Sequence, residues 1–408
     1  MIELPTNATE EQIGAIAHDW IRSNLPEQWR EAAEARDWAA VEKLRADDSV
    51  CKPWFAALGD SGLATPTWPS EYGGLELSQD ESAPIADALE HYRAGRGMDD
   101  FVGLALAGST ILAHGTTEQK TRFLRPLARA EYRWCQLFSE PGAGSDLAGL
   151  STSAVRQEDG SWLINGQKVW NSYAHVSEFG LLMARTDPQS PKHKGITYFL
   201  LDMSLPGVEA RPLRQMTGNA EFNEVFLTDV VVPADAVLGE VNGGWSVAIT
   251  TLMAERSGLT GRPAVGEGVS DELISRARSN GAWDDPLLRD AILKLVVTER
   301  ALQMTTMRSF AEVGPGGVGA EGSIRKLVNA SIEEGFGTLA AEIDPQHALA
   351  WSDEQERRVS QDFLAMKTTS IAGGTTQIQK NIISERVLGL PRDVDPERGV
   401  PFNQRKRA

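Results

Sequence analysis

The sequence predicts an α+β protein in which a helical region, a β-domain and a second helical region follow one another. Residues 1–130 carry helical patterns, seven short strand-like runs follow within 131–240, and helical patterns return over 241–390. The chain has 408 residues, more than one ordinary core accommodates. We therefore expect an N-terminal helical domain, a middle β-sandwich or barrel domain and a C-terminal helical bundle. A polar, exposed arm over 391–408 completes the predicted chain.

The first helical region carries helix start and stop signals. Thr9 is the expected N-cap of its first helix, and a loop rich in Pro and Gly over 65–74 divides the region. The predicted helices cover 9–48, 54–63, 80–93 and 100–114, followed by a helix capped by Thr116 or Thr117.

The middle region changes to the alternation of strands. Turn-forming pairs such as Asp159-Gly160 and Pro206-Gly207 separate the runs, and Ile164-Asn-Gly-Gln167 is also predicted as a hairpin turn. Seven short strands at such spacing are typical of a compact sandwich or barrel. The runs cover 132–139, 151–157, 161–170, 179–186, 195–203, 208–216 and 222–232. After Gly243-Gly244 the helical pattern continues to Leu388, with a break rich in Gly and Pro at 313–322.

The composition of the chain limits the kinds of molecule that it can bind and the compartment in which it works. The formal net charge of −17 argues against nucleic acid or an anionic membrane, since either needs a basic face. No apolar run approaches the ~20 residues that span a bilayer. The two cysteines, Cys51 and Cys135, form no disulfide framework and indicate a reducing compartment. We expect a cytoplasmic protein without a metal site.

One stretch, Trp134 to Leu150, organises the interpretation of the whole chain. It begins as an alternating strand and breaks at Pro141, which cannot donate to a sheet. Gly142 and Gly144 can adopt positive φ, so that successive backbone N–H groups converge on an anion, and Ser145 adds a hydroxyl. Most Gly-rich turns only reverse the chain, so this feature alone is weak evidence.

The string Ser139-Glu-Pro-Gly-Ala-Gly-Ser-Asp146 closely resembles the flavin-contacting signature of acyl-CoA dehydrogenases. The resemblance spans about 50 to 390 and is carried by further segments in the family's order. It implies the acyl-CoA dehydrogenase fold, FAD as cofactor, and oxidation of an acyl-CoA to the trans-2-enoyl-CoA with electrons passed to an electron-transfer flavoprotein. The further matching segments are Trp68–Gly74, His114–Lys120, Asn165–Ser172, Phe222–Pro233 and Gly373–Gln379.

The resemblance also implies which residues contact FAD. Trp170 would cover the isoalloxazine ring, and Ser172 would meet flavin N5. The alternative for Trp170 is a core aromatic without a cofactor role. Ser145 and Arg256 are expected to contact the substrate. The other expected FAD contacts are Gln136, Phe138, Ser139, Gly144, Ser145, Thr375 and Gln377.

Family chemistry requires a carboxylate that removes the α-proton of the thioester, with a pKa raised by burial. In most members it directly precedes the Gly-Thr of the C-terminal segment, where this chain has Gly373. A glycine cannot be a base. Its backbone N–H, with a flavin hydroxyl, can still polarise the thioester carbonyl.

Isovaleryl- and long-chain-type members carry the base on a helix of the C-terminal domain, and the matching residue here is Glu255. On a helical wheel, Arg256 falls within an apolar stripe and Glu255 falls just beyond its edge. The alternative is a structural ion pair, but with Gly373 unable to serve we expect Glu255 to be the base. The stripe comprises Trp245, Ala248, Ile249, Leu252, Met253 and Leu259.

Two family elements have no match. The Arg-x-x-Phe-Gly element should fall near 275–285, where Arg276 and Arg278 are only candidates, and the Gln-x-x-Gly-Gly-x-Gly element should fall at 338–352. Both are supplied across a subunit interface in the family. We therefore expect a heteromer in which a homologous subunit grips the FAD pyrophosphate; a homodimer with other FAD contacts is the alternative.

Two other functions remain open from the sequence: a non-catalytic or half-site partner subunit, and a flavin oxidase or monooxygenase on the same fold. The acyl group is only weakly indicated. Small residues near Glu255, namely Ala254, Ser257 and Gly258, would leave room for a branched or ring-bearing acyl chain.

Overall fold

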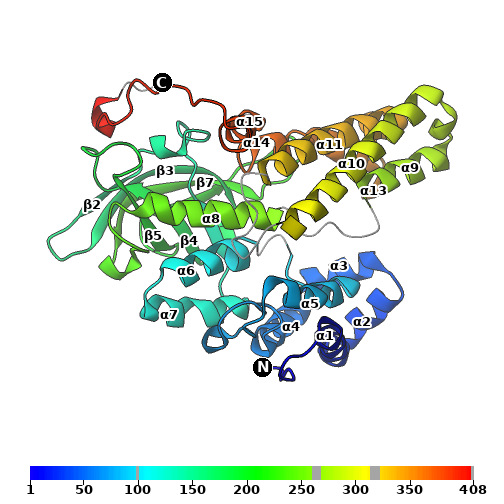
Figure 1. The fold of residues 1–408 in the computed structure, drawn as a ribbon, viewed down its shortest axis with the longest axis horizontal. Helices are drawn as coiled ribbons and strands as arrows, with labels where there is room; N and C mark the ends of the chain where they lie inside the picture. The colour runs from blue at the N-terminus through cyan, green and yellow to red at the C-terminus, as the bar shows by residue number, and fades with distance from the viewer. Residues whose placement is uncertain (98–100, 260–267, 313–321, 406–408) are drawn as a thin grey trace.

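A computed structural model describes residues 1–97, 101–259, 268–312 and 322–405. In Figure 1 the N-terminal helices lie at the bottom, the strands at the left and the C-terminal helices at the upper right. The predicted order of helices, strands and helices is confirmed. The boundaries of the three domains stay predictions.

The first helices pack around a core that contains Trp29 and Trp54. A single helix over 9–48 is wrong: the chain breaks at Pro26, and Asp37 and Asp47 cap new helices. Thr9 and Thr116 are N-caps, as predicted. The elements are α1 Glu10–Asn24, α2 Glu27–Glu34, α3 Trp38–Ala46, α4 Asp48–Ser61, α5 Gln79–His91, the π-helix η3 Val102–Gly108, α6 Ser109–His114 and α7 Thr117–Ala128.

All seven predicted strands are present and belong to one sheet of order β1-β4-β2-β3-β7-β6, with β5 paired to β4. Leu182 of β4 and Val225 of β7 share one core cluster, so the two halves of the sheet enclose it. The strands are β1 Trp134–Leu137, β2 Ser153–Arg156, β3 Trp162–Ser172, β4 Phe179–Arg185, β5 Ile196–Asp202, β6 Val208–Pro212 and β7 Phe222–Val232.

The hairpin turn predicted at 164–167 is wrong. These residues lie inside β3, and the turn between β2 and β3 falls at Gln157–Ser161 instead, where Gly160 has a φ of 89°. Asn165 uses its side chain to bond Asp229 across to β7, at 2.9 and 3.0 Å. The Asn-Gly pair therefore produces a shift of register within a strand rather than a chain reversal.

Helix α8, Gly244–Leu259, packs against β5, η3, α6 and α11 (Figure 1). Thr251 is fully buried in α8, and its Oγ1 lies 2.9 Å from Thr110 Oγ1 of α6 and 3.0 Å from the Tyr198 hydroxyl of β5. We call these three residues the hydroxyl cluster. It joins one residue from each of the three parts of the chain.

The hydroxyl cluster explains why the apolar stripe drawn on the helical wheel is partly wrong. Ile249 and Met253 are exposed, whereas Val247, Ala248 and Thr251 are buried. A threonine can be buried here because its hydroxyl is hydrogen-bonded. Glu255 follows Thr251 by four residues, so it lies on the same side of α8 as the buried face.

The C-terminal helices form a bundle of long and short elements (Figure 1). They include α9 Val269–Asn280, α10 Pro286–Glu312, α11 Gly322–Ile343, α12 Pro345–Leu349, α13 Glu354–Ala365, α14 Thr368–Ile371, α15 Thr376–Ile382 and the π-helix η8 Ile383–Val387.

The C-terminal arm returns to the β-domain. Residues 391–396 are exposed, as predicted, but Phe402 is packed. Its backbone N–H donates to Ser190 O at 3.0 Å, and the Arg185 guanidinium lies 3.6 Å from the centre of its ring. The arm is therefore not a free tail along its whole length.

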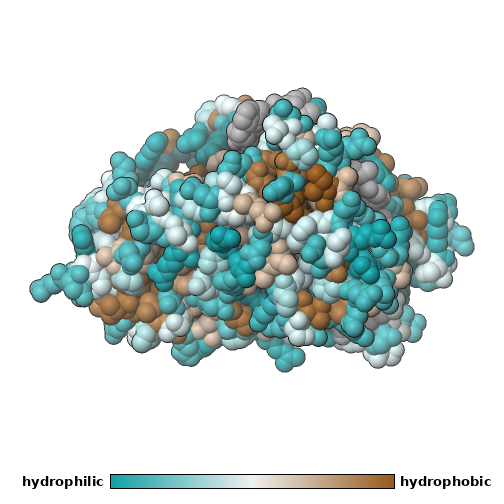
Figure 2. Space-filling view, turned by 90° about the horizontal axis from the view of Figure 1, so that it is seen from below, coloured by the Kyte–Doolittle hydropathy of each residue, from teal (hydrophilic) through white to brown (hydrophobic). Residues whose placement is uncertain are grey.

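Within the described ranges, no helix has the length and apolar character needed to cross a membrane. The same residues contain no cluster of His, Cys, Asp or Glu that could hold a metal ion. Cys51 and Cys135 are both buried, and neither forms a disulfide. Figure 2 shows one face of the molecule as mostly hydrophilic with separate apolar patches.

The hydroxyl cluster predicts coupled losses of stability. Tyr198→Phe and Thr251→Val should each lower the free energy of unfolding by about 1 kcal/mol, because each removes the hydrogen bond between two buried hydroxyls. The double variant should deviate from additivity by about 0.5 kcal/mol or more in urea unfolding. Thr121→Val is the control, because that exposed hydroxyl donates to Thr117 O within its own helix. Additive losses would contradict the coupling.

Candidate active site

The signature loop follows β1 and is closed by two backbone hydrogen bonds between Glu140 and Ala143, of 3.1 and 3.0 Å. Beyond this turn Gly142, Gly144 and Ser145 are exposed. A side chain at either glycine would meet no atom within 4 Å. The loop therefore presents open backbone and a hydroxyl to the solvent side of the sheet.

A buried ion pair supports the loop from beneath. Lys168 Nζ lies 2.8 Å from Glu140 Oε1 and also donates to Phe138 O at 3.1 Å. Glu140 accepts further hydrogen bonds from the backbone N–H groups of Ser151 and Thr152, at 2.7 and 2.9 Å. Burial alone would raise the pKa of Glu140, but Lys168 and these hydrogen bonds lower it to about 2.

Arg185 holds the far end of the loop. Its guanidinium donates to Ala148 O at 2.7 Å, to Leu150 O at 3.1 Å and to Lys192 O at 3.2 Å. Burial lowers the pKa of Arg185 to about 10. With Phe402 against its other side, Arg185 connects the signature loop, the β4–β5 loop and the C-terminal arm.

Trp170 stands out of strand β3. Its φ is 62° and its side chain is 61% exposed, at a shift of register between Lys168 and Asn171. A large residue at positive φ is an outlier that the surrounding structure must maintain. The ring meets Phe222 edge-on, with 6.0 Å between centroids. The alternative of a core aromatic is therefore wrong.

Glu255 lies beside the strand that leads into the signature loop. Gln136 Nε2 of β1 donates to Glu255 Oε2 at 3.5 Å, and the Glu255 side chain is half-buried. The backbone carbonyl of Gln136 accepts from Asn171 Nδ2 at 2.7 Å. Gln136 thus links the α8 carboxylate to the strand that carries Trp170.

The C-terminal glycine segment leads into α15, and α15 packs against α11. Gly373 and Gly374 have φ values of 61° and 91°, which favour glycine at both positions. The buried Gln379 amide donates to both of their carbonyls, at 3.1 and 3.2 Å. Thr375 caps α15, and Gln377 is exposed.

The other predicted residues are placed as follows. Phe138 is buried, whereas Ser139 and Ser172 are half-buried. The side chain of Arg256 lies outside the described residues. Arg276 pairs with Glu272 at 2.5 Å and lies 3.7 Å from Asp362. The predicted contacts of all these residues with FAD or substrate stay predictions.

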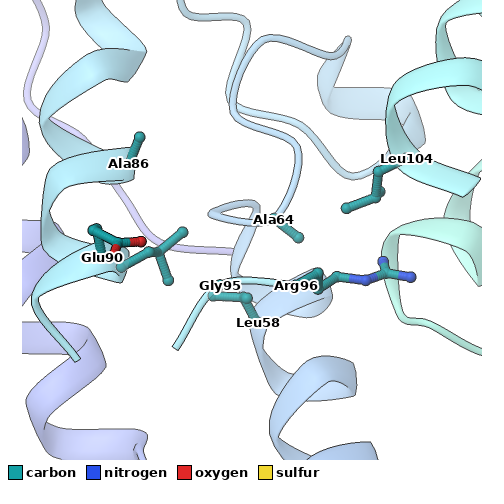
Figure 3. Close-up of a pocket in the computed structure, with 8 residues that line it drawn as sticks. Leu58, Ala64, Ala86, Glu90, Gly95, Arg96 and Leu104 are labelled. Atoms are coloured by element: carbon teal, nitrogen blue, oxygen red, sulfur yellow. The ribbon is translucent and has the colours of Figure 1, made fainter. Parts of the chain in front are cut away.

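The sequence interpretation did not single out Lys168, Arg185 or Asn171. All three are buried polar residues of strands, and a polar side chain at an inward position of a strand is the signal that could have found them. None of the predicted site residues lines the one hollow of about 260 Å³ whose lining residues are drawn in Figure 3. It lies among the N-terminal helices and is lined by Leu58, Ala64, Ala86, Leu89, Glu90, Gly95, Arg96 and Leu104.

Comparison with known proteins agrees with this architecture. Matches to the acyl-CoA dehydrogenase N-terminal, middle and C-terminal domains cover residues 9–131, 135–230 and 242–388. The chain is 36% identical to acyl-CoA dehydrogenase IpdE1 of Mycobacterium tuberculosis, over 94% of this chain and 98% of that protein. It is 44% identical to acyl-CoA dehydrogenase FadE34 of the same organism over 82% of this chain, but that match spans only 46% of FadE34.

Solved structures share the fold. The Tcur3481-Tcur3483 steroid ACAD superposes with a TM-score of 0.75 at 24% identity, covering 96% of this chain and all of that one. The ChsE4-ChsE5 complex of Mycobacterium tuberculosis gives a TM-score of 0.70 with the same identity and coverage. The chain therefore belongs to the acyl-CoA dehydrogenase family. It is an oxidoreductase of the acyl-CoA dehydrogenase type.

The buried pair beneath the loop predicts a pH-dependent defect. Lys168→Met should lower the free energy of unfolding at neutral pH by about 3–5 kcal/mol, because it leaves the Glu140 carboxylate buried without a counter-charge. In the wild type the folded pKa of Glu140 is below its usual value, so its contribution is complete above about pH 4.5 and is lost as the pH falls through about 2.

In Lys168→Met the counter-charge is gone and burial raises the pKa of Glu140, so Glu140 is protonated at a higher pH than in the wild type and the defect should shrink as the pH falls. Urea unfolding at pH 8 and pH 5 measures this. Arg211→Met, which breaks the exposed pair with Glu209, should show no measurable loss at either pH. An equal defect of Lys168→Met at both pH values would contradict the explanation.

Proposed function

We propose that this protein is an FAD-dependent acyl-CoA dehydrogenase that converts an acyl-CoA into its 2-enoyl-CoA, with Glu255 as the base. The observation that carries the proposal is the position of Gln136. Its side chain contacts Glu255, and its backbone carbonyl accepts from Asn171, next to Trp170. Through these two contacts, strand β1 connects the Glu255 carboxylate of α8 to the part of β3 that carries the exposed Trp170 ring.

The residues around this strand fit a flavin. Trp170 offers a flat, exposed indole, and Ser139, Ser145 and Ser172 offer hydroxyl groups. The open backbone of the signature loop suits a close approach by a phosphate. FAD, when bound, supplies the hydride acceptor.

The residues of this chain then have separate tasks. Glu255 accepts the α-proton, while the β-hydrogen leaves as hydride with its electron pair and the α,β double bond forms. The Gly373 N–H donates to the thioester carbonyl and stabilises the negative charge that develops there. Gln377, Thr375, Phe138 and Gly144 are assigned to FAD, and Ser145 and Arg256 to the CoA ester.

We further propose an electron-transfer flavoprotein as electron acceptor and a branched or ring-bearing acyl group as substrate. The proposed class of acyl group is supported by a solved structure of the same fold, which is that of a steroid ACAD. Another relative, 27% identical over 89% of this chain, is the cyclohexane-1-carbonyl-CoA dehydrogenase of Geobacter metallireducens.

We propose that the chain works as a heteromer with a homologous subunit. Arg276, one of the two candidates for the pyrophosphate grip, is paired within the chain, and the segment that should hold the Gly-rich element is largely helical, over α11 and α12. An apolar stripe on α10 is available for a subunit contact. Its members have exposed fractions between 45% and 70%: Leu293, Val297, Met304 and Met307.

The role of Glu255 is tested by the visible spectrum of the purified protein under anaerobic conditions. Wild type should bleach with a suitable acyl-CoA, whereas Glu255→Gln should bind FAD and stay yellow, with bleaching at least about 10²-fold slower. The control is Glu240→Gln, an exposed carboxylate just before α8. Normal bleaching of Glu255→Gln would remove Glu255 as the base.

The subunit contact is tested by Val297→Glu in the co-expressed complex. A charge in the centre of this apolar stripe, which the partner subunit would cover, should dissociate the complex and lower the FAD content per chain, as measured by light scattering and absorbance. Val155→Glu, at another exposed valine, in β2, is the matched control. Unchanged assembly would place the interface elsewhere, and about one FAD per isolated wild-type chain would argue for a homomer.

A further inference from the structure

The backbone around Trp170 is held on both sides by hydrogen bonds. Trp170 and Tyr173 both have positive φ, of 62° and 55°, which a bulky residue keeps only where the surrounding structure enforces it. Before Trp170, the Val169 N–H donates to Ser139 O at 2.9 Å. After it, the Tyr173 N–H donates to Glu221 O at 2.7 Å. Because the indole of Trp170 is 61% exposed, its own packing supplies little of this restraint.

A buried amide connects the strand of Trp170 to the neighbouring strand β7. Asn223 of β7 lies directly opposite Asn171 of β3 in the strand register, and its side chain is completely buried. Asn223 Nδ2 donates both of its hydrogens, to Asn171 O at 2.8 Å and to Glu221 O at 3.0 Å. The Oδ1 atom is therefore the acceptor in its 3.0 Å contact with His175, whose Nδ1 carries a proton. Three hydrogen bonds thus fix the orientation of the Asn223 amide.

Asn171, which directly follows Trp170, is held through its backbone and its side chain. Its carbonyl accepts from Asn223, and its Nδ2 donates to the backbone carbonyl of Gln136 in β1 at 2.7 Å. Asn171 is 1% exposed, so a rotation of this backbone would leave buried polar groups without partners. Phe222, the neighbour of Asn223, meets the Trp170 ring edge-on. Strand β7 therefore contacts both the backbone beside Trp170 and the ring itself.

We propose that Asn223 is a positioning residue that fixes the Trp170 indole in the place where it covers the flavin. The proposal rests on the function proposed above, which gives Trp170 this role. A large side chain at positive φ would relax toward negative φ if the neighbouring backbone were released, and the ring would then leave that place. A ring that is fixed before the cofactor arrives loses less conformational freedom on binding, which raises the affinity. Asn223 therefore contributes to FAD affinity through Trp170.

The test incorporates fluorinated tryptophan into the assembled protein and follows the fluorine NMR resonance of Trp170, assigned by its absence from Trp170→Ala. Asn223→Ala should shift or broaden this resonance before any FAD is added, because the backbone beside the ring is released. It should also weaken FAD binding about tenfold, as measured by titrating the flavin-free protein. A loss of stability with an unchanged Trp170 resonance would mean that Asn223 is only structural, and would overturn the proposal.

His175→Ala is a milder second variant for the case in which Asn223→Ala does not fold. His175 is exposed, and this change removes only the hydrogen bond that orients the Asn223 amide. It should move the Trp170 resonance in the same direction by a smaller amount and weaken FAD binding about threefold. If Asn223→Ala does not fold and His175→Ala leaves the resonance in place, the proposal is overturned.

Asn165→Ala is the matched control. Asn165 also bonds β3 to β7, through Asp229, but it lies at the first of the two register shifts in β3, and Trp170 lies at the second. Asn165→Ala should leave the Trp170 resonance and the FAD dissociation constant unchanged. If Trp170→Ala binds FAD as tightly as wild type, the role of Trp170 in the proposed function fails, and this proposal with it. If Trp170→Ala binds FAD weakly but Asn223→Ala leaves the resonance in place, only the role of Asn223 fails.

Discussion

The signature loop depends on one buried charge pair. Glu140 begins the loop, and Lys168 belongs to the strand that carries Trp170, so their contact ties two separate motifs to one point beneath the sheet surface. The cost of burying two charges is offset because both make further hydrogen bonds, to Phe138 O and from the backbone of Ser151 and Thr152. An apolar pair of the same volume could fill this space but could not orient the backbone of the loop.

A second set of polar contacts sets the position of α8, which carries the proposed base Glu255. Thr251 connects α8 to Thr110 and Tyr198, and Glu255 follows one turn later. Because hydrogen bonds are directional, the hydroxyl cluster specifies both the rotation and the axial position of α8, which apolar packing alone would leave adjustable. The carboxylate is thus placed by contacts from the N-terminal helices and the sheet together.

The sequence was most informative where pattern and local chemistry agreed. Strand alternation located all seven strands, and capping signals located Thr9 and Thr116. It failed where a polar residue has a tertiary partner: the predicted apolar stripe of α8 omits Thr251, which is buried, and Asn165-Gly166 is predicted as a turn but lies inside β3. The places of these residues depend on partners distant in sequence, here Tyr198 and Asp229, which a local pattern does not contain. The contact of Glu255 with Gln136 is likewise a product of the tertiary structure.

The contact of Phe402 with Arg185 has a consequence for the order in which the protein is made. Arg185 supports the signature loop, but the ring that covers it belongs to a residue synthesised more than two hundred positions later. While the ribosome is still producing the C-terminal helices, the nascent β-domain must exist with this guanidinium uncovered. The sheet can form early, whereas Phe402 can cover the Arg185 guanidinium behind the signature loop only after the C-terminal helices have been synthesised.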